Sequence, residues 1–240
     1  MSDIQNLLEY FDELYPVTAA QKRFYDNLTK KYPSPAKFLR IACGTGMFES
    51  FLAREGYDVT GIDNITELLR VANMRRRNQL MSIRFFQMDY ADITGFLGHG
   101  FYNIISCLNN RIIDIQEQKQ FLSDVKKLLT DGGTFVVSML NYDTFVPEPM
   151  VKLPTKESLR VKLYTELWSQ EEGEAFITQN LETGTGKMIP IQRNKRIYPI
   201  TPKAFKAAAK SAGFKNIQFY SGFDREPFTG YEETVVAICS

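Results

Sequence analysis

The chain has 240 residues, a formal net charge of +1, 44% hydrophobic residues and 24% charged residues. This composition is ordinary for a soluble globular protein, and the length allows one large α/β domain or two small ones. A net charge so close to zero provides no overall attraction to nucleic acid or to an anionic membrane. We therefore predict neither of them as a partner.

Cysteine and histidine usage excludes two classes of site. Cys43, Cys107 and Cys239 are far apart and lie in apolar segments, which argues against a disulfide framework. His99 is the only histidine and no Cys-x-x-Cys spacing occurs, so we predict no metal site.

Residues 1–10 lack the basic start and apolar core of a signal peptide, and no apolar run reaches about 18 residues. These features predict a cytoplasmic protein.

The first 140 residues predict helices followed by alternating strands and helices. Residues 4–15 favour one short helix that stops at Pro16, and Thr18 with Gln21 has capping-box spacing for a helix to about Lys31. Strands are then predicted at 38–42, 58–62, 83–87, 101–107 and 134–140, and helices at 47–55, 66–78 and 116–129. This alternation predicts a doubly wound α/β fold, with a mostly parallel sheet covered on both faces.

The pattern changes after Pro154. Residues 161–168, 175–182 and 187–191 alternate apolar and polar side chains, with turns at 171–173 and 184–186, which predicts an antiparallel meander. Thr201-Pro202 then begins a helix that ends at Gly213, and strands follow at 216–220 and 234–240. The sequence thus predicts one domain over residues 1–240, a sheet of seven strands, and a meander inserted after strand five.

One segment is typical of nucleoside binding. Phe38-Leu-Arg-Ile-Ala-Cys-Gly-Thr-Gly46 is an apolar run that ends in a glycine-rich turn, and Asp63 ends the next apolar run. A strand, a tight turn, a helix and a second strand ending in an acid make a nucleoside-binding βαβ unit. The dinucleotide fingerprint would require glycine at Glu49, so NAD and FAD fit poorly, and no P-loop lysine is present.

Ordered motifs carry a family resemblance. Ile41-Ala-Cys-Gly-Thr-Gly46 resembles motif I of the class I S-adenosylmethionine-dependent methyltransferases. Gly61-Ile-Asp63 resembles the strand-two acid of that family, which holds the ribose hydroxyls. Phe86-Gln-Met-Asp89-Tyr90 resembles the loop whose aspartate accepts the adenine amino group. The segments at 101–110 and 128–134 are similar to strand four and to the turn before strand five.

Within this superfamily, Cys107-Leu-Asn-Asn110 and Leu140-Asn-Tyr-Asp143 look most like the glycine and sarcosine N-methyltransferase-like branch. Tyr198-Pro-Ile-Thr-Pro202 and Ala212-Gly-Phe214 continue this pattern. The resemblance implies methyl transfer from S-adenosylmethionine to a small-molecule acceptor, with amines preferred, by direct in-line displacement. Nucleic-acid base enzymes of this fold typically carry an Asn/Asp-Pro-Pro-aromatic motif after strand four, where this chain has Leu108-Asn-Asn-Arg111.

The resemblance also implies site residues, although it assigns no catalytic residue and no metal ligand. The expected cofactor contacts are Tyr15, Ala42, Cys43, Gly44, Thr45, Gly46, Asp63, Asn64, Asp89, Tyr90 and Asn109. The expected acceptor contacts are Asn110, Tyr142 and Trp168, with packing as the alternative for Trp168 and for Tyr15. Residues 1–35 would form a helical lid, and residues 155–195 would cover the acceptor.

Several alternatives stay open. Arg40 stands where the family usually carries an acid: its guanidinium could turn outward, contact the cofactor carboxylate, or weaken binding. The last case would favour a non-catalytic binding module, and a nicotinamide oxidoreductase is a further alternative. Arg75, Arg76 and Arg77 favour a solvated helix end over a basic patch. The oligomeric state is open, with a homodimer among the alternatives.

Overall fold

The computed structural model describes residues 4–76, 82–145, 149–169 and 174–240. These residues divide into two compact units. The major unit consists of Val17–Thr144 and Ile200–Ser240, and the minor unit of Met1–Pro16 and Phe145–Pro199. A single domain over residues 1–240 stays a prediction.

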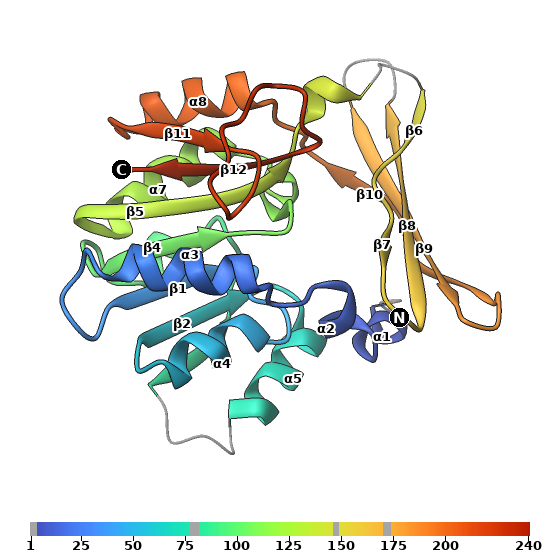
Figure 1. Cartoon of the computed structure of the whole chain (residues 1–240), viewed down its shortest axis with the longest axis horizontal. Coiled ribbons are helices and arrows are strands. Elements are labelled where there is room, and N and C mark those ends of the chain that lie inside the picture. Colours follow the sequence, from blue (N-terminus) through green and yellow to red (C-terminus); the bar gives the residue numbers. More distant parts are fainter. Residues whose placement is uncertain (1–3, 77–81, 146–148, 170–173) are drawn as a thin grey trace. The chain divides into compact units, whose positions relative to one another are not determined.

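The major unit contains a seven-stranded sheet. Its strands are β1 (Lys37–Ile41), β2 (Asp58–Asp63), β3 (Ile83–Gln87), β4 (Tyr102–Cys107), β5 (Leu129–Leu140), β11 (Ile217–Tyr220) and β12 (Thr234–Cys239). Their order is β11-β12-β5-β4-β1-β2-β3 (Figure 1). Strands β1 to β5 are parallel, whereas β12 runs antiparallel to both β5 and β11. The predicted mostly parallel sheet is confirmed.

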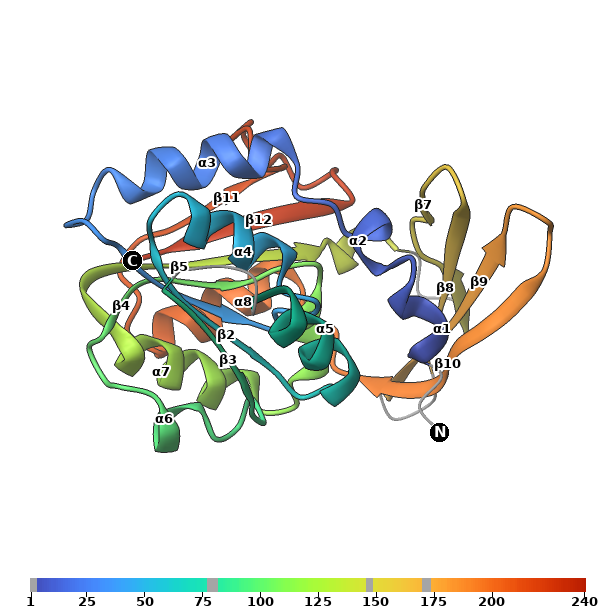
Figure 2. The same ribbon diagram turned by 90° about the horizontal axis from the view of Figure 1, so that it is seen from below.

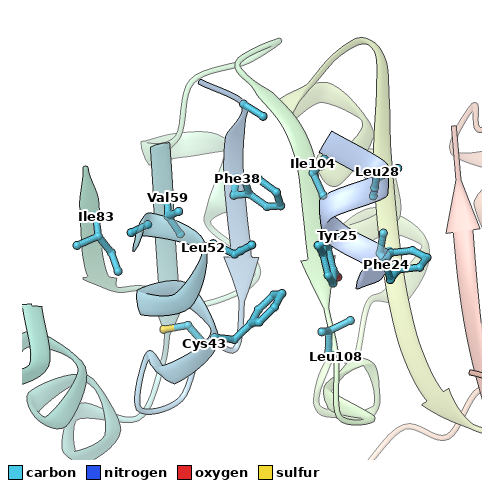
Figure 3. Close-up of a cluster of buried hydrophobic side chains, with 14 of the residues drawn as sticks. Phe24, Tyr25, Leu28, Phe38, Cys43, Leu52, Val59, Ile83, Ile104 and Leu108 are labelled. Carbon is cyan, nitrogen blue, oxygen red and sulfur yellow. The ribbon is translucent and has the colours of Figure 1, made fainter. Parts of the chain in front are cut away.

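Helices cover both faces of this sheet. They are α3 (Ala19–Thr29), α4 (Met47–Arg54), α5 (Thr66–Arg76), α6 (Ile93–Phe96), α7 (Gln118–Leu128) and α8 (Pro202–Ser211), with 3-10 turns η1 (Arg111–Asp114) and η2 (Tyr142–Thr144). On one face, α3, α4 and α5 share a buried cluster in which Tyr25 and Phe38 are fully enclosed (Figure 3). On the other face α7 packs against α8 (Figure 2). The ring centroids of Phe121 on α7 and Phe135 on β5 lie 6.2 Å apart.

Two helices begin where the capping residues predict. Thr18 Oγ1 accepts a hydrogen bond from Gln21 N at 3.1 Å at the start of α3. Thr201 Oγ1 accepts one from Ala204 N at 3.2 Å at the start of α8, which precedes Gly213 with a φ of 95°. The predicted end of α5 near residue 78 lies outside the described residues.

The start of strand five differs from the prediction. The glycine pair at 132–133 was expected as a turn, but it lies inside β5, which begins at Leu129. Gly132 has a φ of 72°, and the pairing of β5 with β4 changes register after Tyr102. A bulge of this kind absorbs extra residues within a strand, so β5 starts directly after α7.

The minor unit is an antiparallel sheet. Its strands are β6 (Met150–Lys152), β7 (Lys156–Glu157), β8 (Val161–Ser169), β9 (Ala175–Thr183) and β10 (Met188–Ile197). Their order is β10-β9-β8-β6, with β7 paired to β8. The predicted meander after strand five is confirmed, although its turn at 171–173 lies outside the described residues.

Two short helices cover one face of the minor sheet. The single helix predicted over residues 4–15 is wrong, since α1 (Gln5–Leu8) and α2 (Phe11–Leu14) are separated by a bend. Leu7 of α1 and Leu14 of α2 both pack against Val161 and Leu181 of the sheet. The chain tightens at the end of α1, where Tyr10 N donates to the Leu7 carbonyl, three residues earlier, at 3.0 Å.

Gly61 of β2 has no room for a side chain, because a Cβ there would lie 2.7 Å from Phe85 Cδ1. We expect Gly61→Ala to lower the free energy of unfolding by about 2 kcal/mol, as overpacking in a core does. Gly95→Ala is the matched control, since no described atom lies within 4 Å of a Cβ built there. Urea unfolding compares both variants, and Gly61→Ala/Phe85→Leu should recover part of the loss. Wild-type stability of Gly61→Ala would contradict this packing.

Candidate functional site

The strands β1 and β4 lie side by side at the centre of the sheet, and the strand order reverses direction between them. Open α/β sheets bind ligands at such a switch point, at the carboxyl ends of the strands. Five residues after these two strands adopt the left-handed backbone conformation, with φ between 56° and 70°: Ala42, Gly44, Gly46, Asn109 and Asn110. Left-handed residues other than glycine are uncommon and gather at functional sites. The backbone therefore marks the same edge that the sequence predicts.

The glycine turn between β1 and α4 is held from two sides. Asp63 Oδ2 accepts a hydrogen bond from Gly44 N at 2.8 Å, and Asp63 Oδ1 accepts one from Ile65 N at 3.0 Å. Arg75 Nη1 on α5 donates to the Thr45 carbonyl at 3.0 Å. Asp63 is only 1% exposed, so its carboxylate ties the turn to β2. Each carboxylate oxygen has a second lone pair, which keeps the predicted ribose contact chemically available.

Two predicted acceptor residues meet beyond β4 and β5. Asn110 Nδ2 donates to the Tyr142 hydroxyl oxygen at 2.9 Å, and Asn110 Oδ1 accepts from Leu140 N at 3.1 Å. Burial raises the pKa of Tyr142 to about 12. Asn109 N donates to Ser138 Oγ at 2.8 Å, which fixes the exit of β4 against β5. Asn110 therefore orients a tyrosine hydroxyl that stays protonated at neutral pH.

The loop after β3 provides an open pocket. Asp89 is exposed, and its Oδ1 accepts a hydrogen bond from Ala91 N at 2.9 Å. The pocket beside it has a volume of about 420 Å³ and is lined by Phe86, Gln87, Met88, Asp89, Asp92, Phe96 and Leu97. Tyr90 is buried, and its hydroxyl donates to Asn64 Oδ1 at 3.4 Å. A carboxylate and two phenylalanines at this edge suit a flat, nitrogen-rich ring.

Arg40 points inward rather than to solvent. Its side chain is 6% exposed, and its Nε lies 3.3 Å from Glu49 Oε1 in the first turn of α4, where Glu49 is 1% exposed. Burial raises the pKa of Glu49 to about 7, and the Arg40 guanidinium opposes this shift. Of the alternatives left open by the sequence, the outward orientation is therefore wrong.

Tyr15 and Trp168 belong to the minor unit. The Tyr15 ring lies 4.8 Å from Phe11 and 4.9 Å from the ammonium of Lys156. Trp168 is 41% exposed and is the register partner of Phe176 across β8 and β9. Because side chains alternate along a strand, Trp168 lies on the face opposite to buried Leu167. The binding roles of both residues stay predictions.

The sequence did not predict the contacts of Arg75 on α5 and Glu49 on α4. Arg75 was expected to be a solvated helix-end cation, and this is wrong because it is half-buried and bonds Thr45. Arg77 lies outside the described residues. Glu49 was considered only as a break in the dinucleotide fingerprint, whereas it pairs with Arg40. The spacing of nine residues between Arg40 and Glu49, one charge in an apolar strand and one on a buried helix face, was the available signal.

Comparisons with known proteins agree with this geometry. The model of a family described as a methyltransferase domain matches residues 38–133. Glycine/sarcosine N-methyltransferase of Aphanothece halophytica is 25% identical over 153 residues, which cover 60% of this chain and 56% of that protein. The chain spans about half the length of the curated relatives it matches. Over residues 38–133 the chain is therefore similar to a methyltransferase domain.

Solved structures share the fold over the whole chain. The CcbJ methyltransferase of Streptomyces caelestis has a TM-score of 0.81 at 17% identity, over 100% of this chain and 97% of that one. An amino pentose methyltransferase of Micromonospora echinaspora, solved with S-adenosylmethionine bound, has a TM-score of 0.66 at 17% identity, over 98% and 97%. The predicted fold is confirmed, and the family resemblance is confirmed over residues 38–133.

Two kinds of feature are absent from the described residues, which are 4–76, 82–145, 149–169 and 174–240. In these residues no group of three or more His, Cys, Asp or Glu side chains is arranged to hold a metal ion. No helix in the same residues has the length and apolarity needed to cross a membrane.

Ala42 is a non-glycine residue in a left-handed conformation, with a φ of 56°. This conformation costs an L-residue about 1–2 kcal/mol, of which part is offset by the lower unfolded-state entropy of alanine. We expect Ala42→Gly to raise the free energy of unfolding by about 0.5–1 kcal/mol. Ala53→Gly within α4 is the control and should lower it by about 1 kcal/mol. Urea unfolding of the two variants gives the sign of each change in the free energy of unfolding. A lower value for Ala42→Gly than for the wild type would show that the turn is unstrained.

Arg75 and Arg76 are neighbours with different targets, which makes a matched pair of variants. Arg75 bonds the Thr45 carbonyl, whereas Arg76 Nη1 reaches the Ile83 carbonyl at 3.5 Å. We expect Arg75→Ala to speed hydrogen exchange of the Gly46 amide roughly five- to tenfold, since one hydrogen bond contributes about 1 kcal/mol. Arg76→Ala should leave that amide unchanged. Equal exchange in the two variants, measured by NMR, would show that Arg75 does not hold the turn.

Proposed function

We propose that the protein is an S-adenosylmethionine-dependent methyltransferase that acts on a small-molecule amine. The observation that carries this proposal is the edge at β1 and β4, where a glycine turn held by Asp63 faces two left-handed asparagines. The match of residues 38–133 to a methyltransferase domain supports the same conclusion.

The residues of this edge fit the parts of the cofactor. S-adenosylmethionine carries an adenine, a ribose and a zwitterionic methionine end, but no phosphate. Gly44 and Gly46 lack a Cβ, which allows close approach of a ligand to the turn. Asp63 would hold the ribose, and exposed Asp89 beside its pocket would accept the adenine amino group. The buried charges of Arg40 and Glu49 have hydrogen-bonding capacity that an amino-acid end would use.

Alignment is the main contribution that we propose for the protein. When bound, S-adenosylmethionine supplies a methyl group on a sulfonium that is already a good leaving group. Asn109 would orient the methionine amino group of the cofactor, and Asn110 and Tyr142 would hold the acceptor nitrogen in line with the methyl. Well-oriented reactants gain about 7 kcal/mol over free ones. Asn110 fixes the Tyr142 hydroxyl, whose raised pKa makes it a hydrogen-bond donor rather than a base at neutral pH.

The preference for a nitrogen acceptor rests on chemistry and on relatives. One relative is named glycine/sarcosine N-methyltransferase, and one structure of the same fold is an amino pentose methyltransferase. The turn after β4 reads Leu108-Asn-Asn-Arg111, without the proline pair of base methyltransferases. We extend the proposal to residues 1–35 as a lid with Tyr15, and to residues 155–195 with Trp168 as the cover of the acceptor. A cytoplasmic location and a homodimer stay predictions.

Calorimetry with S-adenosylhomocysteine, the product of methyl transfer, tests the proposal. We expect micromolar binding to the wild type, and Asp63→Ala should weaken it at least about 100-fold because a charged hydrogen-bonding group is lost. Asp58→Ala is the matched control, since Asp58 lies at the other end of β2 and pairs with Arg84. A thermal melt of each variant reports how far the loss of the Asp63–Gly44 bond unfolds the turn.

The outcomes separate the candidate functions. Absence of binding to the wild type at millimolar concentration would overturn the proposal, and unchanged affinity of Asp63→Ala would make Asp63 a structural residue only. Binding without transfer of labelled methyl to a panel of primary and secondary amines would favour the non-catalytic module. Quenching of the protein's fluorescence on titration with NADH would instead favour the oxidoreductase.

A further inference from the structure

One face of the minor sheet, which we call the covered face because α1 and α2 pack on it, has a polar row between two apolar rows (Figure 2). Because side chains alternate along a strand, residues two positions apart on β8 or on β9 point to the same face. Three successive rows of the covered face are the register pairs Leu163 with Leu181, Thr165 with Gln179, and Leu167 with Ile177. The polar pair therefore interrupts the apolar pattern at the same place on both strands.

The polar row is accessible, whereas the rows on either side of it are buried. The leucine pair of the first row is at most 1% exposed, because it lies in the cluster that α1 and α2 cover. Both residues of the third row are 7% exposed. Thr165 and Gln179 are partly exposed, so a ligand can reach the row.

The periodicity of β8 and β9 favours apolar side chains at both positions of the middle row. Gln179 Nε2 instead donates a hydrogen bond to Thr165 Oγ1 at 3.0 Å. Gln192 on β10 is the register partner of Gln179, so polar residues occupy this register position on three neighbouring strands. Polar residues at apolar positions of a sheet reduce stability unless they have a function. The repeated departure from the pattern indicates a binding function for the row.

The polar pair has hydrogen-bonding groups left for a ligand. Among the described residues, the Gln179 amide makes no side-chain hydrogen bond other than the one to Thr165. The amide therefore has its oxygen and a second N–H available, and Thr165 has its hydroxyl hydrogen. These groups are neutral and include both donors and acceptors. A hydroxyl group is likewise a neutral donor and acceptor, so the row matches a ligand that carries hydroxyls.

The covered face is also the face on which Tyr15 lies. Tyr15 packs against the cluster that contains Leu163 and Leu181, and this row is two residues, or about 7 Å, from the polar row along each strand. Trp168 and its register partner Phe176 point to the opposite face. A ligand that reaches Tyr15 therefore meets the polar row and not Trp168.

We propose that Thr165 and Gln179 bind a hydroxyl group of the methyl acceptor, and that this acceptor is a hydroxyl-bearing amine. The inference rests on the proposed function, because it takes an amine as the acceptor. Within residues 155–195 it assigns the acceptor contact to the polar row in place of Trp168. Packing, the alternative that the sequence left open, is then the role of Trp168.

Serinol and isopropylamine are matched probes, because they share a carbon skeleton and an amino group and differ only in two hydroxyls. The full chain, saturated with S-adenosylhomocysteine, should bind serinol at least about tenfold more tightly, as expected for one or two neutral hydrogen bonds. NMR titration of isotope-labelled protein measures both affinities. Serinol should shift the side-chain amide signals of Gln179 and leave the indole N–H signal of Trp168, the only tryptophan, unchanged.

Variants then assign the preference to the polar row. Gln179→Met keeps the length of the side chain without the amide, and Thr165→Val keeps the shape without the hydroxyl. The double variant should lose the preference for serinol, and its melting temperature should be unchanged or higher because it completes the apolar face. Thr178→Val is the matched control, since Thr178 precedes Gln179 on β9 and points to the opposite face. It should keep the preference.

Three results would overturn the inference while leaving the proposed function intact. The first is a wild type that binds S-adenosylhomocysteine but does not bind serinol more tightly than isopropylamine. The second is a serinol-induced shift of the Trp168 signal without a shift of the Gln179 signals. The third is a preference for serinol that persists in Thr165→Val/Gln179→Met, which would make the pair purely structural. Failure of the wild type to bind S-adenosylhomocysteine would instead overturn the proposed function itself.

Discussion

The hydrogen bond from Gly44 N to Asp63 Oδ2, at 2.8 Å, is the contact on which the site depends. It joins the turn after β1 to the end of β2, so one carboxylate fixes the separation of two neighbouring loops. The Arg75 guanidinium holds the opposite side of the turn through the Thr45 carbonyl. A backbone with left-handed glycines has many alternative conformations, and these two contacts select one before any ligand arrives. Preorganisation of this kind is what an alignment mechanism requires.

Charge compensation beneath the turn makes this arrangement possible. Asp63 and Glu49 are acids with 1% exposure, and the pKa of Glu49 rises through burial and through the Asp63 charge, while Arg40 and Arg75 lower it. The folded pKa of Glu49, about 7, lies above the ordinary value of 4.5. The folded state therefore holds the extra proton, so this group reduces stability as the pH rises between those values.

The fold could be predicted from the sequence because the signals that specify it are local. The cap at Thr18, the glycine turn at Gly44 and the apolar strands each specify a neighbouring stretch of backbone, and the sheet follows from their alternation. The sequence also predicted that Asn110 and Tyr142 lie at the same edge of the sheet, because each follows a strand that ends there. The single helix over residues 4–15 and the turn at residues 132–133 were wrong, because the local pattern is compatible with one helix or two and with a turn or an irregular strand. The role of Arg75 could not be predicted, because its long side chain reaches from α5 to the Thr45 carbonyl, and helical periodicity does not encode such a contact.

Arg40 and Glu49 show most clearly how the structure changes the interpretation of the sequence. Taken singly, Arg40 is a departure from a methyltransferase pattern and Glu49 is a departure from a dinucleotide pattern. Their separation of 3.3 Å makes them one unit, in which each charge is tolerable in the interior because the other is present. The buried basic residue of β1 and the buried acid of α4 are therefore best understood together and not as two separate departures. The same argument explains how a basic residue is accommodated at this strand position: the partner on α4 restores local neutrality.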